Sequence, residues 1–193
     1  VHVGLHCSDT APWTFSLYLA GRDAALTDVL PVLASLGLTV LHEHPYRVDR
    51  ADGLGVRIYE FAVQPAPHVH AAEQLGTEER LAEAFRRMWV GHSDVDALNE
   101  LVLRAGLTCA EVSVLRTYVR YLQQLCFGHS ITHFAEVLGE YREVTRALIT
   151  LFLTTFDPTI DAAVRGRRVE EARGRLAAEL AAVLSLDADR VLS

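Results

Sequence analysis

Strand-like patterns of apolar and polar residues recur three times in the first third of the chain. In residues 14–20 every second side chain is large and apolar, which is the period of a strand with one face on a core. Residues 38–48 and 56–63 are rich in β-branched and aromatic residues, and the turn-forming run 49–53 separates them. These patterns predict a first strand followed, later in the chain, by a β-hairpin.

A helical pattern lies between the first predicted strand and the hairpin. Apolar residues recur at helical spacing within residues 25–36, and Gly37 follows as a C-terminal stop. Pro31 falls inside this pattern. Because proline lacks an N–H donor and is tolerated mainly in the first helical turn, we expect the regular helix to begin near Leu30.

The periodicity changes after the hairpin. Residues 64–76 combine two prolines with small and polar residues, which indicates an exposed linker. A helix is expected over residues 78–89, and only helical patterns follow it. We therefore predict an α+β protein with two domains. The first, residues 1–92, holds the sheet, its first helix, the linker and a second helix, and the second, residues 93–193, is α-helical.

Capping residues divide the helical region. Ser93 is the candidate cap of a helix that runs through Arg104. Thr108 and Glu111 have the spacing of a capping box, in which each residue bonds the other's backbone N–H. Two apolar stripes follow on this helix, so we expect neighbours on both of its sides. The second stripe comprises Val114, Tyr118, Tyr121 and Leu125.

Three more helices are expected, over residues 130–138, over residues 140–156, and from Pro158 onward with Asp157 as cap. The last is long and carries dense Arg and Glu opposite an apolar side. The apolar side of this helix suits packing within the chain or against a partner helix. The charged cluster favours a solvated face, with a subunit contact as the alternative.

The composition of the chain excludes several classes of reaction and of partner. The chain has 193 residues, a net charge of −7 and 50% hydrophobic residues, which is typical of a water-soluble globule. All 18 basic residues are Arg. Without lysine the chain cannot form a Schiff base or a Walker A loop, and no basic run favours nucleic acid as a partner. Residues 147–156 are the most apolar stretch and are too short to cross a membrane.

The start of the chain and its cysteines indicate context. Residues 1–3 contain neither an initiator Met nor the basic beginning of a secretion signal, which suggests an excised fragment. Cys7, Cys109 and Cys126 are odd in number and form no CxxC pair. We interpret them as buried, reduced thiols of a cytoplasmic protein, with metal or redox roles as the alternatives.

Two histidine pairs have a spacing that a metal site could use. His42 and His44 share one face of a predicted strand, and His129 and His133 lie one helical turn apart. A catalytic zinc site needs a third protein ligand, and neither pair belongs to an HExxH motif. We therefore predict no metal site and interpret these imidazoles as solvated or at the edge of the core.

No catalytic residue is predicted. The chain has no GxGxxG fingerprint and no GxSxG elbow. Glu43 and Glu60 could form a carboxylate pair across the hairpin, but solvent-facing strand positions are the favoured interpretation.

Two regions resemble one family. LTDVLPVL at 26–33, LGL at 36–38 and EHPYRV at 43–48 resemble the ACT-like region of the large-type NAD-dependent glutamate dehydrogenases. Residues within 98–118, and matches continuing in register beyond them, are similar to the helical region between that ACT-like part and the catalytic domain. The match resumes within 185–190.

The resemblance implies a parent enzyme that oxidatively deaminates L-glutamate to 2-oxoglutarate and ammonium with NAD. In that family the glutamate site lies on a lysine-dependent substrate domain and the NAD site on a Rossmann domain, both C-terminal to this region. The fragment would therefore hold no cofactor and act as a non-catalytic regulatory or scaffolding segment. Its implied partners are the catalytic domain of the same chain, other subunits of a homo-oligomer and an amino-acid effector. The alternative is a stand-alone ACT-like module that binds an amino acid or a protein.

The resemblance also implies a ferredoxin-like antiparallel sheet with helices on one face. An ACT unit alternates as βαββαβ, so a fourth strand is needed, and residues 1–6 are the candidate. The expected ligand site is the loop and helix start at Gly21, Arg22, Asp23 and Thr27, where Arg22 could bind a carboxylate and Asp23 an amine. The first helix lacks the early glycine that effector-binding ACT modules often have, which disfavours a ligand.

Overall fold

The computed structural model divides the chain into two compact units, Val1–Val112 and Ser113–Ser193. This division lies further along the chain than the boundary expected after residue 92. The structure describes residues 1–7, 12–21, 23–49, 55–69, 76–126 and 128–192.

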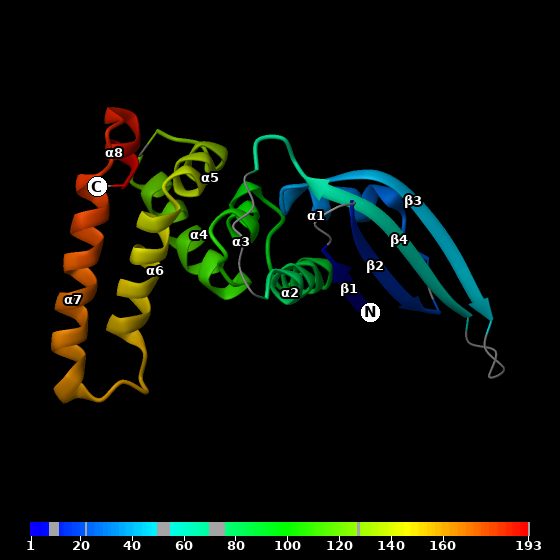
Figure 1. Cartoon of the computed structure of the whole chain (residues 1–193), viewed down its shortest axis with the longest axis horizontal. Helices are drawn as coiled ribbons and strands as arrows, with labels where there is room; N and C mark the ends of the chain where they lie inside the picture. The colour runs from blue at the N-terminus through cyan, green and yellow to red at the C-terminus, as the bar shows by residue number, and fades with distance from the viewer. Residues whose placement is uncertain (8–11, 22, 50–54, 70–75, 127, 193) are drawn as a thin grey trace. The chain divides into compact units, whose positions relative to one another are not determined.

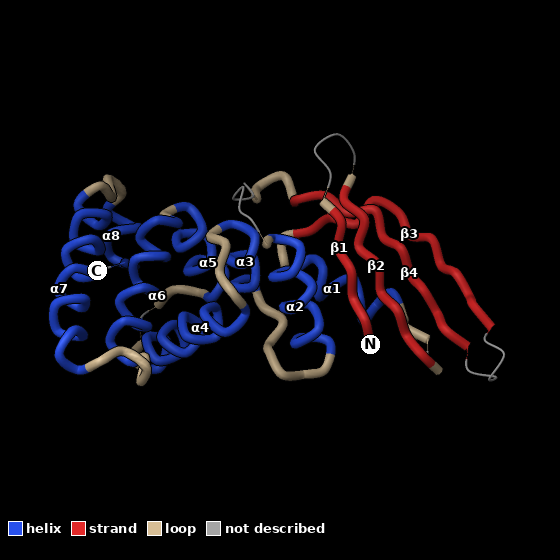
Figure 2. The backbone as a smooth tube through the Cα atoms, turned by 60° about the horizontal axis from the view of Figure 1, so that its bottom comes forward, coloured by secondary structure: helices blue, strands red, loops and turns tan. Residues whose placement is uncertain are grey.

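The first unit is built on a four-stranded antiparallel sheet with the order β1-β2-β4-β3 (Figures 1 and 2). Both the predicted first strand and the predicted hairpin are present. The N-terminal segment supplies the fourth strand, as expected from the ACT-like pattern, because Val3 and Leu5 pair with Leu17 and Phe15 on the buried face. The strands are β1 His2–His6, β2 Trp13–Ala20, β3 Leu38–Asp49 and β4 Gly55–Pro65.

Two helices, α1 (Leu26–Ser35) and α2 (Thr77–Trp89), pack on the sheet. Phe15 of β2 is buried between Phe61 and Phe85, and its ring lies 4.7 Å from that of Phe85 on α2. If β1 is counted as the last strand, the elements follow the βαββαβ order of an ACT unit. The N-terminal segment of the chain then takes the place of the last strand. The α+β, ferredoxin-like prediction is confirmed.

Helix α1 begins earlier than expected. It starts at Leu26 and contains Pro31, so the prediction of a start near Leu30 is wrong. Pro31 removes the N–H that would bond the Thr27 carbonyl. Burial of Val29, Val32 and Leu33 against the sheet offsets this loss, because a helix in a protein is held mainly by its packed apolar face.

The remaining helices are short in the first unit and longer in the second. Those of the first are η1 Ala97–Glu100 and α3 Leu101–Arg104, and α4 Cys109–Gln124 spans the division between the units. Those of the second are α5 Ile131–Glu140, α6 Arg142–Phe156, α7 Ala162–Ala181 and α8 Leu186–Leu192. Among the described residues, no helix is both long enough and apolar enough to span a bilayer.

Capping at the start of α4 agrees with the sequence, and capping before η1 does not. The Thr108 N–H donates to Glu111 Oε2 at 2.7 Å, and the Glu111 N–H donates to Thr108 Oγ1 at 3.3 Å. Before η1, Asp96 accepts from the Leu98 N–H at 3.1 Å. Ser93 is not the cap, and its buried Oγ forms no hydrogen bond with a described residue.

The last long helix also begins later than predicted. Asp157 accepts from both the N–H and the Oγ1 of Thr159, which makes a turn instead of a helix start. Asp161 caps α7 by accepting from the Ala163 N–H at 2.7 Å. Arg165 closes this turn, because its Nη2 donates to the carbonyls of Asp157 and Ile160 at 2.8 Å each.

The second apolar stripe of α4 is not buried among the described residues. The exposed fractions are 50% for Tyr118, 56% for Tyr121 and 60% for Leu125. Leu115 and Val119 of the first stripe are buried. The expectation of packing on both sides of this helix is therefore not met within the described part of the chain.

Candidate functional site

The ligand-binding residues predicted from the sequence lie where β2 passes into α1. Gly21 has a positive φ of 70°, and its N–H donates to the Gly55 carbonyl at 3.0 Å. Thr27 is exposed in the first turn of α1. Arg22 lies outside the described residues. The structure thus places Gly21, Asp23 and Thr27 in one exposed connection.

The carboxylate of Asp23 already has a cationic partner. Its Oδ1 lies 2.6 Å from Nε of Arg57 on β4, and the Asp23 side chain is 68% exposed. An amine ligand at Asp23 would compete with this guanidinium. The neighbouring Ala24 N–H donates to the Tyr59 hydroxyl at 3.2 Å, so β4 also holds the backbone of this connection.

The chemistry-bearing residues of β3 do not form a site. His42 and His44 share a face, as predicted, with ring centroids 5.1 Å apart. Glu43 pairs with Phe61, whereas Glu60 pairs with His44. Because consecutive strand residues point to opposite faces, the Glu43 and Glu60 carboxylates lie on different faces of the sheet. A carboxylate pair across the hairpin is excluded.

The expectation of buried thiols is confirmed for Cys109 and wrong for Cys126, which is exposed, and for Cys7, which is half-buried. Cys7 is a poor nucleophile. Burial, together with the nearby carboxylates of Glu78 and Glu79, raises the pKa of its thiol to about 11. Its backbone N–H donates to Glu78 Oε1 at 2.6 Å, which ties the end of β1 to α2. A thiol with this pKa is almost wholly protonated at neutral pH.

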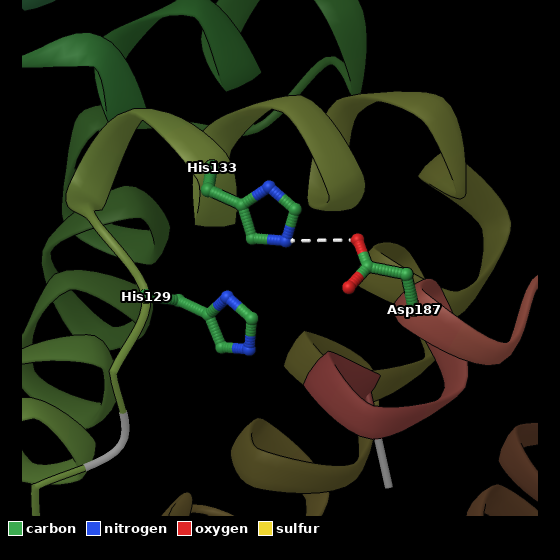
Figure 3. Close-up of side chains that lie close together, drawn as sticks. All are labelled: His129, His133 and Asp187. Atoms are coloured by element: carbon green, nitrogen blue, oxygen red, sulfur yellow. Dashed lines mark ion pairs between the residues drawn. The ribbon is translucent and has the colours of Figure 1, made fainter.

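The second histidine pair lies in the helical unit and acquires a carboxylate (Figure 3). His133 is in the first turn of α5, whereas His129 precedes the helix, so the two are not one turn apart on a single helix. Their rings stack at 4.6 Å with an interplanar angle of 20°. Asp187 of α8 approaches the pair, and one ligand atom from each of the three residues lies within 4.8 Å of the others.

The His133 imidazole lies between two carboxylates. Its Nε2 is 3.2 Å from Asp187 Oδ2, and its Nδ1 is 4.0 Å from Glu136 Oε2. Nε2 is shielded from solvent, yet it forms no hydrogen bond of good geometry with a described residue. Sequence reasoning missed Asp187, because no local pattern relates a residue of α8 to a histidine of α5.

An apolar cavity of about 540 Å³ also lies within the helical unit. Arg173 and Arg190 are the charged residues at its wall. Cavities of this size are in the range of small-molecule pockets. The apolar lining comes from α4, α5, α6 and α8, and includes Leu115, Tyr118, Val119, Phe134, Ile149, Phe152, Phe156 and Leu192.

Comparison with known families identifies both parts of the chain. Residues 6–75 match the ACT3 domain of glutamate dehydrogenase, and residues 93–158 match helical motif 3 of glutamate dehydrogenase. The chain therefore contains the ACT3 and helical motif 3 regions of the glutamate dehydrogenase family. The resemblance noted in the sequence is therefore confirmed over the sheet and over the helices that follow it.

Individual relatives within the family extend the match. The chain is 41% identical over 179 residues to the NAD-specific glutamate dehydrogenase of Mycobacterium tuberculosis and 37% identical over 179 residues to that of Halomonas elongata. Each alignment covers 91% of this chain. Identity is 39% over 153 residues to the Pseudomonas aeruginosa enzyme. The chain spans only 11%, 11% and 9% of the lengths of these relatives.

Proposed function

We propose that this chain is a non-catalytic regulatory and scaffolding segment of a large NAD-dependent glutamate dehydrogenase. The full chain of that enzyme would oxidatively deaminate L-glutamate to 2-oxoglutarate and ammonium, with NAD bound outside this segment. The observation that carries the proposal is the pair of family matches, to an ACT domain and to a helical motif, within a chain that spans 11% of NAD-specific relatives.

The chemistry of the described residues supports a non-catalytic role. The chain contains no lysine, so it cannot supply the lysine that the resemblance implies for the glutamate pocket. The Glu43 and Glu60 carboxylates lie on opposite faces of the sheet, and the raised pKa of Cys7 keeps its thiol protonated.

Exposed apolar side chains support the scaffolding part. Tyr121, Leu125 and Phe156 of the helical unit are 56%, 60% and 62% exposed. Covering such groups is favourable by roughly 25 cal/mol per Å² of apolar area, so they suit contacts with other parts of the parent enzyme or with its other subunits. We propose that the parent is a homo-oligomer in which this face takes part.

The scaffolding role can be tested in the full-length parent enzyme. We expect Tyr121→Asp to lower the oligomeric mass measured by light scattering, or glutamate-dependent NADH formation, because it places a charge on the proposed contact face. Gln124→Asp, an exposed position on the same helix, is the matched control and should leave both unchanged. Equal behaviour of the two variants would contradict the scaffolding role.

The non-catalytic role has a direct assay. The 193-residue chain alone should form no NADH from glutamate and NAD above background. Turnover by the isolated chain would overturn the proposal. The gene separates it from the stand-alone module: a reading frame that continues into a lysine-containing glutamate pocket supports a segment, and a stop codon after Ser193 supports a module.

The effector site at Gly21, Arg22, Asp23 and Thr27 stays a proposal. Thermal denaturation of the chain with each amino acid, compared between the unmodified chain and Arg22→Ala, tests it. A stabilisation that Arg22→Ala removes supports amino-acid sensing. The absence of any shift discards it, and the ion pair between Asp23 and Arg57 favours that outcome.

A further inference from the structure

We propose that His129, His133 and Asp187 form a binding site for one divalent transition-metal ion of the zinc class. The site joins α5 to α8 in the helical unit (Figure 3). It is independent of the catalytic role of any parent enzyme, because it rests on three side chains within one compact unit.

The first argument is the separation of the donor atoms. Two ligands that each bind zinc at about 2.0–2.1 Å in a tetrahedral site lie roughly 3.3 Å apart. The distance from His133 Nε2 to Asp187 Oδ2 is 3.2 Å. His129 brings the third donor within 4.8 Å of the others, a distance that a small rotation of its ring can shorten.

The second argument is the state of His133 Nε2. The atom is shielded from solvent and faces a carboxylate without forming a hydrogen bond of good geometry. A buried polar nitrogen without a partner is costly. A metal ion between Nε2 and Asp187 would satisfy both groups at once.

The third argument is the carboxylate on the other side of the ring. Metal-binding histidines usually direct their second nitrogen to a carboxylate or carbonyl, which fixes the tautomer. Glu136 Oε2 lies 4.0 Å from His133 Nδ1, too far for a hydrogen bond. With a metal ion bound at Nε2, the charge of Glu136 would favour the proton on Nδ1, which is the tautomer that leaves the Nε2 lone pair for the metal. The Glu136 side chain is 65% exposed, so a change of its rotamer can bring it closer.

The backbones that carry the three ligands are held by local contacts. Ser130 caps α5 by accepting from the His133 N–H at 3.1 Å. The His129 carbonyl accepts from Gln123 Nε2 at 3.2 Å, and the His129 ring packs edge-on against the buried Phe134. On α8, the Ala188 N–H donates to Ser185 Oγ at 3.3 Å, beside Asp187. The ligands are therefore largely preorganised.

The donor set selects the metal. Two imidazoles and one carboxylate suit zinc and its neighbours in the transition series, whereas calcium and magnesium prefer oxygen ligands alone. Three protein ligands leave one tetrahedral position for water. Bound metal would link two helices that are distant in the sequence, so it should stabilise the packing of α8 against α5.

The test uses the 193-residue chain stripped of metal and titrated with Zn²⁺ by calorimetry. We expect one equivalent to bind and the melting temperature to rise. Asp187→Asn and His133→Ala should each raise the Kd by at least about tenfold, since each removes one of three ligands. The double variant His42→Ala/His44→Ala is the matched control, because it removes the histidine pair of β3, and its Kd should not change.

Cobalt substitution separates this site from others. The Co²⁺-loaded chain should show visible bands of tetrahedral nitrogen and oxygen coordination that His129→Ala abolishes. His129 precedes α5, so this variant leaves the residues of that helix and its Ser130 cap unchanged. Absence of binding by the unmodified chain, an equal loss in the strand control, or a thiolate charge-transfer band that Cys126→Ser removes would each overturn the proposal.

Discussion

The two units of this chain differ in how completely they bury their large apolar side chains. In the sheet unit, Phe15, Phe61 and Phe85 are at most 1% exposed where α1 and α2 pack on the sheet, although Leu41, Tyr46 and Val48 of β3 are 46–49% exposed. In the helical unit, Tyr121 and Phe156 remain more than half exposed. Side chains that are already buried in a core need no further contact, whereas apolar side chains that stay more than half exposed are suited to one.

Helix α7 shows how the second unit comes to be open. Along Ala162–Ala181 only Ala172 is fully buried. The helix packs beside α6, but its remaining surface carries ion pairs such as Arg173 with Glu170 at 3.0 Å, which are exposed and contribute little stability. The sheet unit is thus held by its core, and the helical unit by fewer apolar contacts.

A matched pair of Phe→Ala substitutions gives the strongest test of this contrast. Phe85→Ala should lower the free energy of unfolding by about 3–5 kcal/mol, because it leaves a cavity beside Phe15 and Trp89. Phe156→Ala should cost less than about 1 kcal/mol, since its ring is 62% exposed. Urea denaturation followed by circular dichroism measures both. Similar losses in the two variants would refute the contrast.

A buried amide in the first unit gives a smaller effect. Asn99 is 2% exposed, and its Nδ2 donates to the Asp94 carbonyl at 2.9 Å and to Met88 Sδ at 3.1 Å. Asn99→Ala should cost about 1–3 kcal/mol in the same denaturation experiment, because it removes the hydrogen bonds of a buried amide.

The helical unit offers a counterpart to Asn99 in Thr145, which is fully buried and donates to the Leu138 carbonyl at 2.7 Å. Thr145→Val keeps the side-chain volume and removes this bond. We expect a loss of about 1 kcal/mol. If Thr145→Val costs more stability than Asn99→Ala, buried polar contacts contribute more to the helical unit than to the sheet unit.

The start of α4 provides the next step down in size. Thr108→Ala removes the hydroxyl of the capping box and should cost about 1 kcal/mol. Thr117→Ala is the control on the same helix, because its hydroxyl only bonds back to the Ser113 carbonyl and contributes little. Equal losses for the two variants, measured by thermal denaturation, would argue against the cap.

The sequence predicted best those features that a few neighbouring residues decide. The alternation of residues 14–20 predicts a strand, and the spacing of Thr108 and Glu111 predicts a capping box. The structure contains both. The start of α7 was missed because Asp157 and Asp161 are both good caps, and the choice depends on Arg165, which bonds the intervening carbonyls.

The candidate metal site illustrates the limit more sharply. His129 and His133 were visible as a pair, but a pair is weak evidence for a metal. The third donor, Asp187, comes from a separate helix, and only tertiary packing brings it to the histidines. The same holds for the predicted ligand site. The sequence indicates Asp23, but it does not indicate that Arg57 of β4 pairs with the Asp23 carboxylate.

The turn that precedes α7 gives the smallest and most local prediction. Hydrogen bonds from the Thr159 hydroxyl and N–H lower the pKa of Asp157, because they stabilise its charged form. A lowered folded pKa means that the stabilisation is present above the unfolded pKa and is lost as the pH falls through the folded one, below about pH 4. Thr159→Val removes the hydroxyl, the larger cause, so the pKa of Asp157 should rise toward its ordinary value. Carboxyl NMR titration measures it, with Thr154→Val as the control on α6, and an unmoved pKa in Thr159→Val would show that the turn does not form.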